Sequence, residues 1–68
     1  MRIFVNEKAV EIGGNTNLID VLEKVDVQPD RRGIAVAVND RVVRRVDWTD
    51  HRVEAGDRIE VIQATQGG

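Results

Sequence analysis

The sequence predicts a small α+β domain in which a mixed sheet of four to five strands is covered by one α-helix, in the order ββαβββ. Short β-branched runs bounded by polar or glycine residues recur along the chain, and such runs are typical of strands. Between the second and third runs, one segment has the apolar spacing of an amphipathic helix. With 68 residues, the chain has room for one hydrophobic core.

The first two strands are expected at residues 2–5 and 9–12, joined as a hairpin by a polar turn that begins with Asn6. Asparagine accepts the left-handed backbone conformation that tight hairpin turns need. Because side chains alternate along a strand, Ile3 and Val5 share one face. That face of the sheet needs a cover.

A helix after this hairpin supplies the cover. Asn17 is the expected N-cap, with Asp20 in the first turn, and Thr16 is the alternative cap. Pro29 has no N–H and disfavours helix at the residue before it, so we expect the helix to end near Asp26. The helix has one apolar stripe, formed by Leu18, Val21, Leu22 and Val25.

Three further extended segments follow the helix. Residues 34–38 form an unbroken apolar run, which predicts a strand covered on at least part of both faces. Residues 41–46 are expected to return as a short strand or extended segment. A tight turn at residues 54–57, with Gly56 at positive φ, leads into the last strand at residues 58–63.

Composition disfavours several classes of function. The chain has 12 acidic and 10 basic residues, a net charge of −2 and two aromatic residues, so it lacks the basic surface and stacking platform of a nucleic-acid binder. It has no cysteine, which excludes disulfides and thiolate metal sites and fits a reducing compartment. No run approaches the length of a membrane span, and we expect a soluble cytoplasmic protein with no membrane partner.

Individual polar and aromatic side chains predict no catalytic site. His51 is the single histidine and the chain has no serine or cysteine, so a loop or capping role is expected for it. Trp48 is expected to fill the core. The arginine pairs at 31–32 and 44–45 are ordinarily solvated, and the functional alternative is that one pair docks on an acidic partner surface.

The end of the chain, residues 64–68, is predicted to be a flexible tail on a domain of residues 1–63. Gly67 and Gly68 lack Cβ atoms and can pass through a narrow channel, and five extended residues reach ~17 Å. The carboxylate of Gly68 is ionised at neutral pH and is a poor acyl donor until it is activated, for example as an acyl-adenylate. The alternative is a frayed end or a truncation scar.

A contact surface for partners is predicted beside this tail. Val61 and Ile62 lie on opposite faces of the last strand, so one of them is expected to be exposed. We expect the exposed residue to form a modest apolar contact together with Thr65 and Gln66.

The chain resembles the ThiS family of sulfur carriers of thiamin biosynthesis, within the β-grasp or ubiquitin-like fold. The resemblance covers nearly the whole chain, and its chemically specific motif is the terminal Gly67-Gly68. Gln66 departs from the small or apolar residue that is more usual there. The matching positions are residues 3–7, 21–25, 35–39 and 42–43, then Arg45, Trp48, His51, Gly56 and Asp57.

This resemblance implies a carrier that is not itself a catalyst and binds no cofactor. A ThiF-like adenylyltransferase would use ATP to activate Gly68, and a sulfur donor would convert the adenylate to a thiocarboxylate. A ThiG-like thiazole synthase would then take the sulfur into the thiazole ring. Because the chain lacks cysteine, carried sulfur has no thiol to sit on and would have to occupy the terminal carboxyl.

Three alternatives remain open at this point. A MoaD-like carrier for molybdopterin or other sulfur metabolism would keep the same fold and the same end. A non-covalent β-grasp interaction module would work without a free Gly68. A protein modifier joined to lysines would form conjugates.

Overall fold

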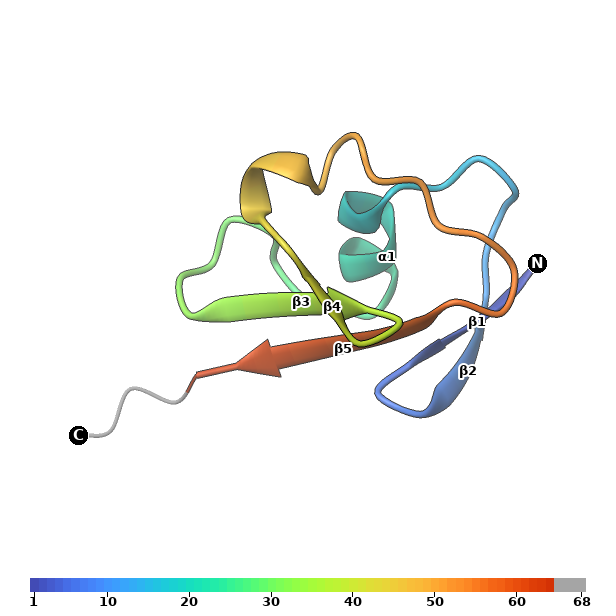
Figure 1. Ribbon diagram of the computed structural model, residues 1–68, viewed down its shortest axis with the longest axis horizontal. Coiled ribbons are helices and arrows are strands. Elements are labelled where there is room, and N and C mark those ends of the chain that lie inside the picture. The colour runs from blue at the N-terminus through green and yellow to red at the C-terminus, as the bar shows by residue number, and fades with distance from the viewer. Residues whose placement is uncertain (65–68) are drawn as a thin grey trace.

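A computed structural model describes residues 1–64, which form a mixed five-stranded sheet with one helix across one of its faces (Figure 1). The strands lie in the order β2-β1-β5-β3-β4, so the last strand is the central one. It runs parallel to β1 and antiparallel to β3. The elements are β1 (Arg2–Val5), β2 (Lys8–Glu11), α1 (Leu18–Lys24), β3 (Ile34–Val38), β4 (Arg41–Val43), the 3-10 helix η1 (Arg45–Asp47) and β5 (Arg58–Gln63). The predicted β-grasp arrangement is confirmed.

Two hairpins of the same design flank the central strand. In the first turn Asn6 and Glu7 have φ values of 50° and 71°, and in the second Asn39 and Asp40 have the same two values. Two successive left-handed residues are the signature of the type I′ turn, whose twist matches that of the paired strands. The prediction for Asn6 is confirmed. The second strand begins at Lys8, one residue earlier than predicted, because the turn needs only two residues.

The asparagine side chains join both hairpins to β5. The Asn6 amide accepts a hydrogen bond from the Val61 nitrogen at 2.9 Å and donates one to the Val61 carbonyl at 3.3 Å. Asn39 accepts one from the Arg58 nitrogen, also at 2.9 Å. Strand β1 ends at Val5. Beyond that point, the side-chain amide of Asn6 makes the hydrogen bonds to the β5 backbone that a neighbouring strand would make.

Helix α1 is closed at both ends by local hydrogen bonds. At its start, the Asn17 side chain accepts from the Asp20 nitrogen at 2.9 Å, and the Asp20 carboxylate accepts from the Asn17 nitrogen at 3.3 Å. This capping box confirms Asn17 as the N-cap. The helix ends near Asp26 as predicted, but the cause is the left-handed conformation of Asp26 (φ 63°), not Pro29. The Val27 nitrogen then bonds back to the Leu22 carbonyl at 2.8 Å, as in a Schellman motif.

Replacing Asp26 with glycine is expected to stabilise the domain by about 1 kcal/mol, because glycine removes the steric cost of the left-handed conformation. Urea denaturation of Asp26→Gly measures the change. Asp26→Ala is the matched control, since it removes the carboxylate but keeps the Cβ, and it should not be stabilised. Equal stability of the two variants would contradict this account of the helix end.

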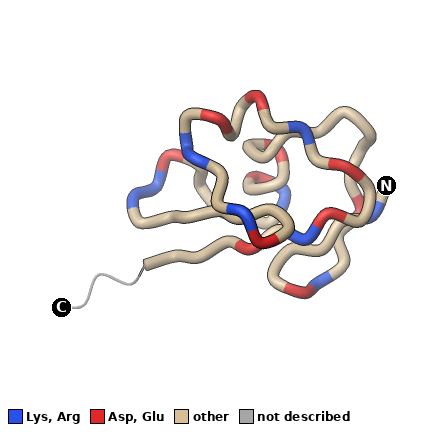
Figure 2. The backbone as a smooth tube through the Cα atoms, in the orientation of Figure 1, with Lys and Arg blue, Asp and Glu red and all other residues tan. Residues whose placement is uncertain are grey.

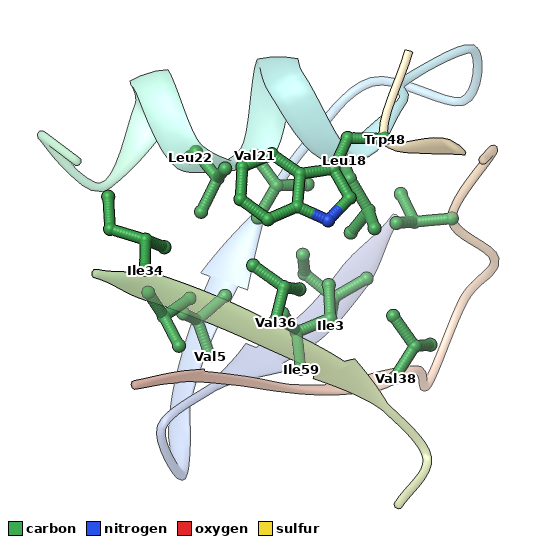
Figure 3. Packing of buried hydrophobic residues seen from close by; sticks show 12 residues of the cluster. Ile3, Val5, Leu18, Val21, Leu22, Ile34, Val36, Val38, Trp48 and Ile59 are labelled. Atoms are coloured by element: carbon green, nitrogen blue, oxygen red, sulfur yellow. The ribbon is translucent and has the colours of Figure 1, made fainter. Parts of the chain in front are cut away.

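The hydrophobic core lies between α1 and the sheet (Figure 3). Trp48 is its largest side chain, 1% exposed, and the indole lies between the helix and the sheet. Its Nε1 donates a hydrogen bond to the Val43 carbonyl at 2.9 Å, which satisfies the one polar atom of the ring. The expected core role of Trp48 is confirmed. The remaining buried residues are Ile3, Val5, Leu18, Val21, Leu22, Ile34, Val36, Val38, Val53, Ile59 and Val61.

The strand expected at residues 34–38 is confirmed, whereas the segment expected after it is wrong in part. The second face of β3 is covered only in part, because Ala35 is exposed and Ala37 is half-buried there. Alanine side chains make residues 34–38 an unbroken apolar run in the sequence. Because these side chains are short, they do not need to be buried on the second face of the sheet. The segment expected at residues 41–46 leaves the sheet after Val43 and turns into η1, which brings the next residue, Trp48, into the core.

Candidate functional site

The root of the tail is fixed to the sheet through its last described residue. Strand β5 pairs with β3 as far as Gln63, which lies opposite Ile34. The Ala64 nitrogen then donates a hydrogen bond to the Gly33 carbonyl at 2.7 Å. The predicted site residues Thr65, Gln66, Gly67 and Gly68 lie outside the described residues, and their roles stay predictions.

Gly33 anchors the root of the tail, a structural role that the sequence alone did not single out. It has a φ of 79°, and a Cβ built on it would lie 3.4 Å from the Ala64 carbonyl oxygen and 3.5 Å from the Ala64 Cβ. The left-handed backbone favours glycine here, whereas a Cβ would make only ordinary van der Waals contacts with Ala64. A glycine directly before an apolar strand was the available signal, but the contact with Ala64 joins residues that are far apart in the chain.

The structure decides between the two candidate contact residues on β5. Val61 is 9% exposed and belongs to the core, whereas Ile62 is 55% exposed on the opposite face of the sheet. Val61 is therefore removed from the predicted contact surface. The alternation that was expected along this strand is confirmed, and the contact role expected for its exposed residue, Ile62, stays a prediction.

Helix α1 covers one face of the sheet and leaves the other uncovered (Figure 1). Ile62 belongs to an apolar patch on the uncovered face. Ile62 lies opposite Ala35 in the strand register, and Ala37 lies opposite Val42, which is 77% exposed. These four residues on β5, β3 and β4 are called the sheet-face patch below. One member of the patch, Ile62, is on β5, two residues before Ala64 at the root of the tail.

Arg45 has a structural role that the sequence analysis missed. Its guanidinium carbon lies 4.5 Å from the centre of the Trp48 ring, a cation–π contact. The same guanidinium donates hydrogen bonds to the carbonyls of Pro29 and, at 2.8 Å, Arg31. Arg44 and Arg45 therefore do not act as a surface pair, because Arg45 is committed to the loop before β3.

The His51 main chain helps to hold the start of the helix. Its carbonyl accepts a hydrogen bond from the Leu18 nitrogen at 3.1 Å, and its nitrogen bonds the Asp47 carbonyl at 2.9 Å. This agrees with the loop role expected for His51. Among residues 1–64, no three His, Cys, Asp or Glu side chains come together as a metal site. Neither helix in this part of the chain is long and apolar enough to cross a membrane.

A mixed five-stranded sheet, with parallel β1 and β5 inside it and one covering helix, places the chain in the β-grasp class. The chain belongs to the ThiS family, whose family model matches residues 1–68. The sulfur carrier protein ThiS of Escherichia coli (strain K12) is 32% identical over 68 residues, which cover 100% of both chains.

Two solved structures from Geobacter metallireducens have the same fold. The crystal structure of a thiamine biosynthesis protein (ThiS) matches with a TM-score of 0.82 at 24% identity, covering 100% of both chains. The NMR solution structure of a thiamine biosynthesis protein matches with a TM-score of 0.76 at 27% identity, covering 100% of this chain and 88% of the other. The predicted fold and the predicted family are both confirmed.

Proposed function

We propose that the protein is a sulfur carrier of thiamine biosynthesis whose Gly68 carboxylate is adenylated and then converted to a thiocarboxylate. The observation that carries the proposal is the position of the root of the tail, Ala64. Residues 65–68 directly follow a central strand that is held to the sheet through Ala64. Membership of the ThiS family and the name of the E. coli relative support the same assignment.

The chemistry needs a free carboxylate on a slender stalk, and this chain contains no cysteine that could carry sulfur instead. A Gly68 oxygen attacks the α-phosphate of ATP, pyrophosphate leaves, and the acyl-adenylate has AMP as a good leaving group. A hydrosulfide equivalent from a sulfur donor then attacks the carbonyl carbon, AMP departs, and the thioacid loses its proton. The net change on the carrier is one oxygen replaced by one sulfur.

Other proteins supply the catalytic groups in this proposal. A ThiF-like adenylyltransferase binds and uses ATP in the cytoplasm, and a ThiG-like thiazole synthase receives the sulfur. The carrier contributes recognition and reach. Gly67 and Gly68 suit a narrow channel because they lack Cβ atoms.

Intact-mass measurement tests the proposal directly. The protein is incubated with ATP, an adenylyltransferase from the same organism and a sulfide source. We expect a mass gain equal to the exchange of one oxygen for sulfur, located on Gly68 by fragmentation, and a return to the original mass after turnover with thiazole synthase. Another ThiS-family carrier serves as the positive control for the enzyme. If the enzyme modifies that carrier but causes no ATP-dependent mass change in this protein, the assignment is refuted.

The sheet-face patch is the proposed recognition surface, with Thr65 and Gln66 continuing it along the tail. Replacing Ile62 with glutamate is expected to raise the KM for the carrier in adenylation by about tenfold, because a charge would be buried against the partner. Steady-state kinetics measure the change. Val46→Glu is the matched control, since Val46 is 69% exposed but lies in η1, outside the patch. Equal KM values for the two variants would exclude the patch.

A further inference from the structure

The loop before β3 carries two exposed arginines that have no ion-pair partner in the described part of the chain. Arg31 and Arg32 are both exposed, and the salt bridges within residues 1–64 involve other arginines. Asp30 is the one acidic residue in this loop. Residues 29–33 are called the basic loop below.

The side chain of Arg45 holds the main chain of the basic loop through hydrogen bonds. The guanidinium of Arg45 bonds the carbonyls of Pro29 and Arg31 while it stacks on the buried Trp48 ring. The Arg31 nitrogen also bonds the Gln28 carbonyl at 3.1 Å. These bonds use backbone atoms of the loop, so the Arg31 and Arg32 side chains are not needed to shape it.

The basic loop is joined directly to the root of the tail. Gly33, the residue after Arg32, accepts the hydrogen bond from the Ala64 nitrogen at 2.7 Å. In Figure 2 the adjacent blue residues of this loop lie at the same end of the molecule as the end of β5. The backbone of two arginines is thus held beside Ala64, the residue from which the tail departs.

We propose that the basic loop docks on an acidic surface at the rim of the channel that receives the tail. The proposal rests on the proposed function, in which an enzyme takes the tail into a buried site. Once the tail is inside, the rim of its channel faces the residues around Ala64, and the basic loop is among them. Arginine fits such a surface because its planar guanidinium pairs with carboxylates through two parallel hydrogen bonds.

The charge distribution gives the loop a second effect, on the rate of encounter. The whole chain has 12 acidic and 10 basic residues, so without these two arginines the count is 12 against 8 and the net charge is −4. The basic loop is therefore a local positive site on an acidic protein, placed at the reactive end. An acidic channel rim attracts the basic loop and repels the rest of the carrier, which is acidic. The carrier therefore approaches the enzyme with its tail toward the channel.

Charge reversal tests the proposal with a control of equal charge change. Arg31→Glu/Arg32→Glu is compared with Lys8→Glu/Arg41→Glu, which reverses two exposed cations on the edge strands β2 and β4. Each double variant changes the net charge by −4 (from −2 to −6). Adenylation kinetics and direct titration against the adenylyltransferase are measured at low and high salt, and circular dichroism checks the fold.

We expect the basic-loop variant to raise both the KM and the Kd by about tenfold or more at low salt, with kcat unchanged, and the difference to shrink as salt screens the charges. The control should differ little from wild type. Equal effects of the two variants, or no effect of the first, would overturn the proposal. Lost affinity for a single-stranded RNA with an unchanged Kd for the enzyme would overturn it too, and would assign the loop to nucleic acid.

The two proposals can fail separately in this design. A wild-type chain that binds the enzyme through the basic loop but gains no adenylate would refute the sulfur-carrier chemistry and support the docking role. If the wild-type chain is adenylated and its KM equals that of the basic-loop variant, the docking role is refuted and the sulfur-carrier chemistry is supported.

Discussion

Removal of Gly68, or addition of one residue after it, is expected to abolish the ATP-dependent exchange of oxygen for sulfur. Either change moves or blocks the carboxylate that the adenylyltransferase must reach, while the folded body up to Ala64 keeps every contact described above. Intact mass measures the exchange, and thermal unfolding should be unchanged in both variants. The expected effect is complete loss, because no other residue supplies an acyl group in the same position.

Gly67→Ala serves as the control for this prediction. It keeps the terminal carboxylate and adds one methyl group to the stalk, so exchange should persist at a reduced rate. If the chain without Gly68 gained sulfur as fast as the intact chain, the working group would lie elsewhere and the carrier assignment would be wrong.

Replacing Trp48 with alanine is expected to leave most molecules unfolded at room temperature. The loss of a buried tryptophan costs about 3–5 kcal/mol, and a domain of this size has a stability of only a few kcal/mol. The change also removes the ring under the Arg45 guanidinium, so the basic loop loses its support. Circular dichroism and urea denaturation measure the outcome.

Trp48→Phe is the matched variant, because it keeps an aromatic ring in the core and beside Arg45 but removes the Nε1 donor to the Val43 carbonyl. We expect it to fold with a loss of about 1–3 kcal/mol. A native-like urea midpoint for Trp48→Ala would contradict the central place given to this side chain.

Local signals in the sequence were enough to predict most of the fold. The Asn17 N-cap, the left-handed Asn6 and the positive φ of Gly56 (84°) each depend on residues within a few positions of one another. Alternation along β5 correctly predicted that one of Val61 and Ile62 would be exposed. It also indicates which one, although the sequence analysis left this open: Val61 shares a face with the apolar Ile59, whereas Ile62 shares its face with charged residues.

The features that sequence reasoning missed all depend on contacts between distant segments. Arg45 looked like half of a surface pair, and only the folded chain brings it to Trp48 and to the loop carbonyls. The meeting of Gly33 with Ala64 likewise joins opposite ends of two strands. Strand β4 ends at Val43 because the chain must then turn to bring Trp48 into the core. The strand propensities of residues 44–46 do not indicate this turn.

The central place of β5 has a consequence for the order in which the domain folds. The two hairpins meet only on that strand, which comes last in the chain among the described strands. The sheet therefore cannot close until β5 has paired, and the parallel pairing of β1 with β5 joins segments from opposite ends of the described chain, a non-local contact that forms slowly. A chain without β5 has neither a closed sheet nor the Ala64–Gly33 hydrogen bond, so the root of the tail is placed only when the whole sheet has formed.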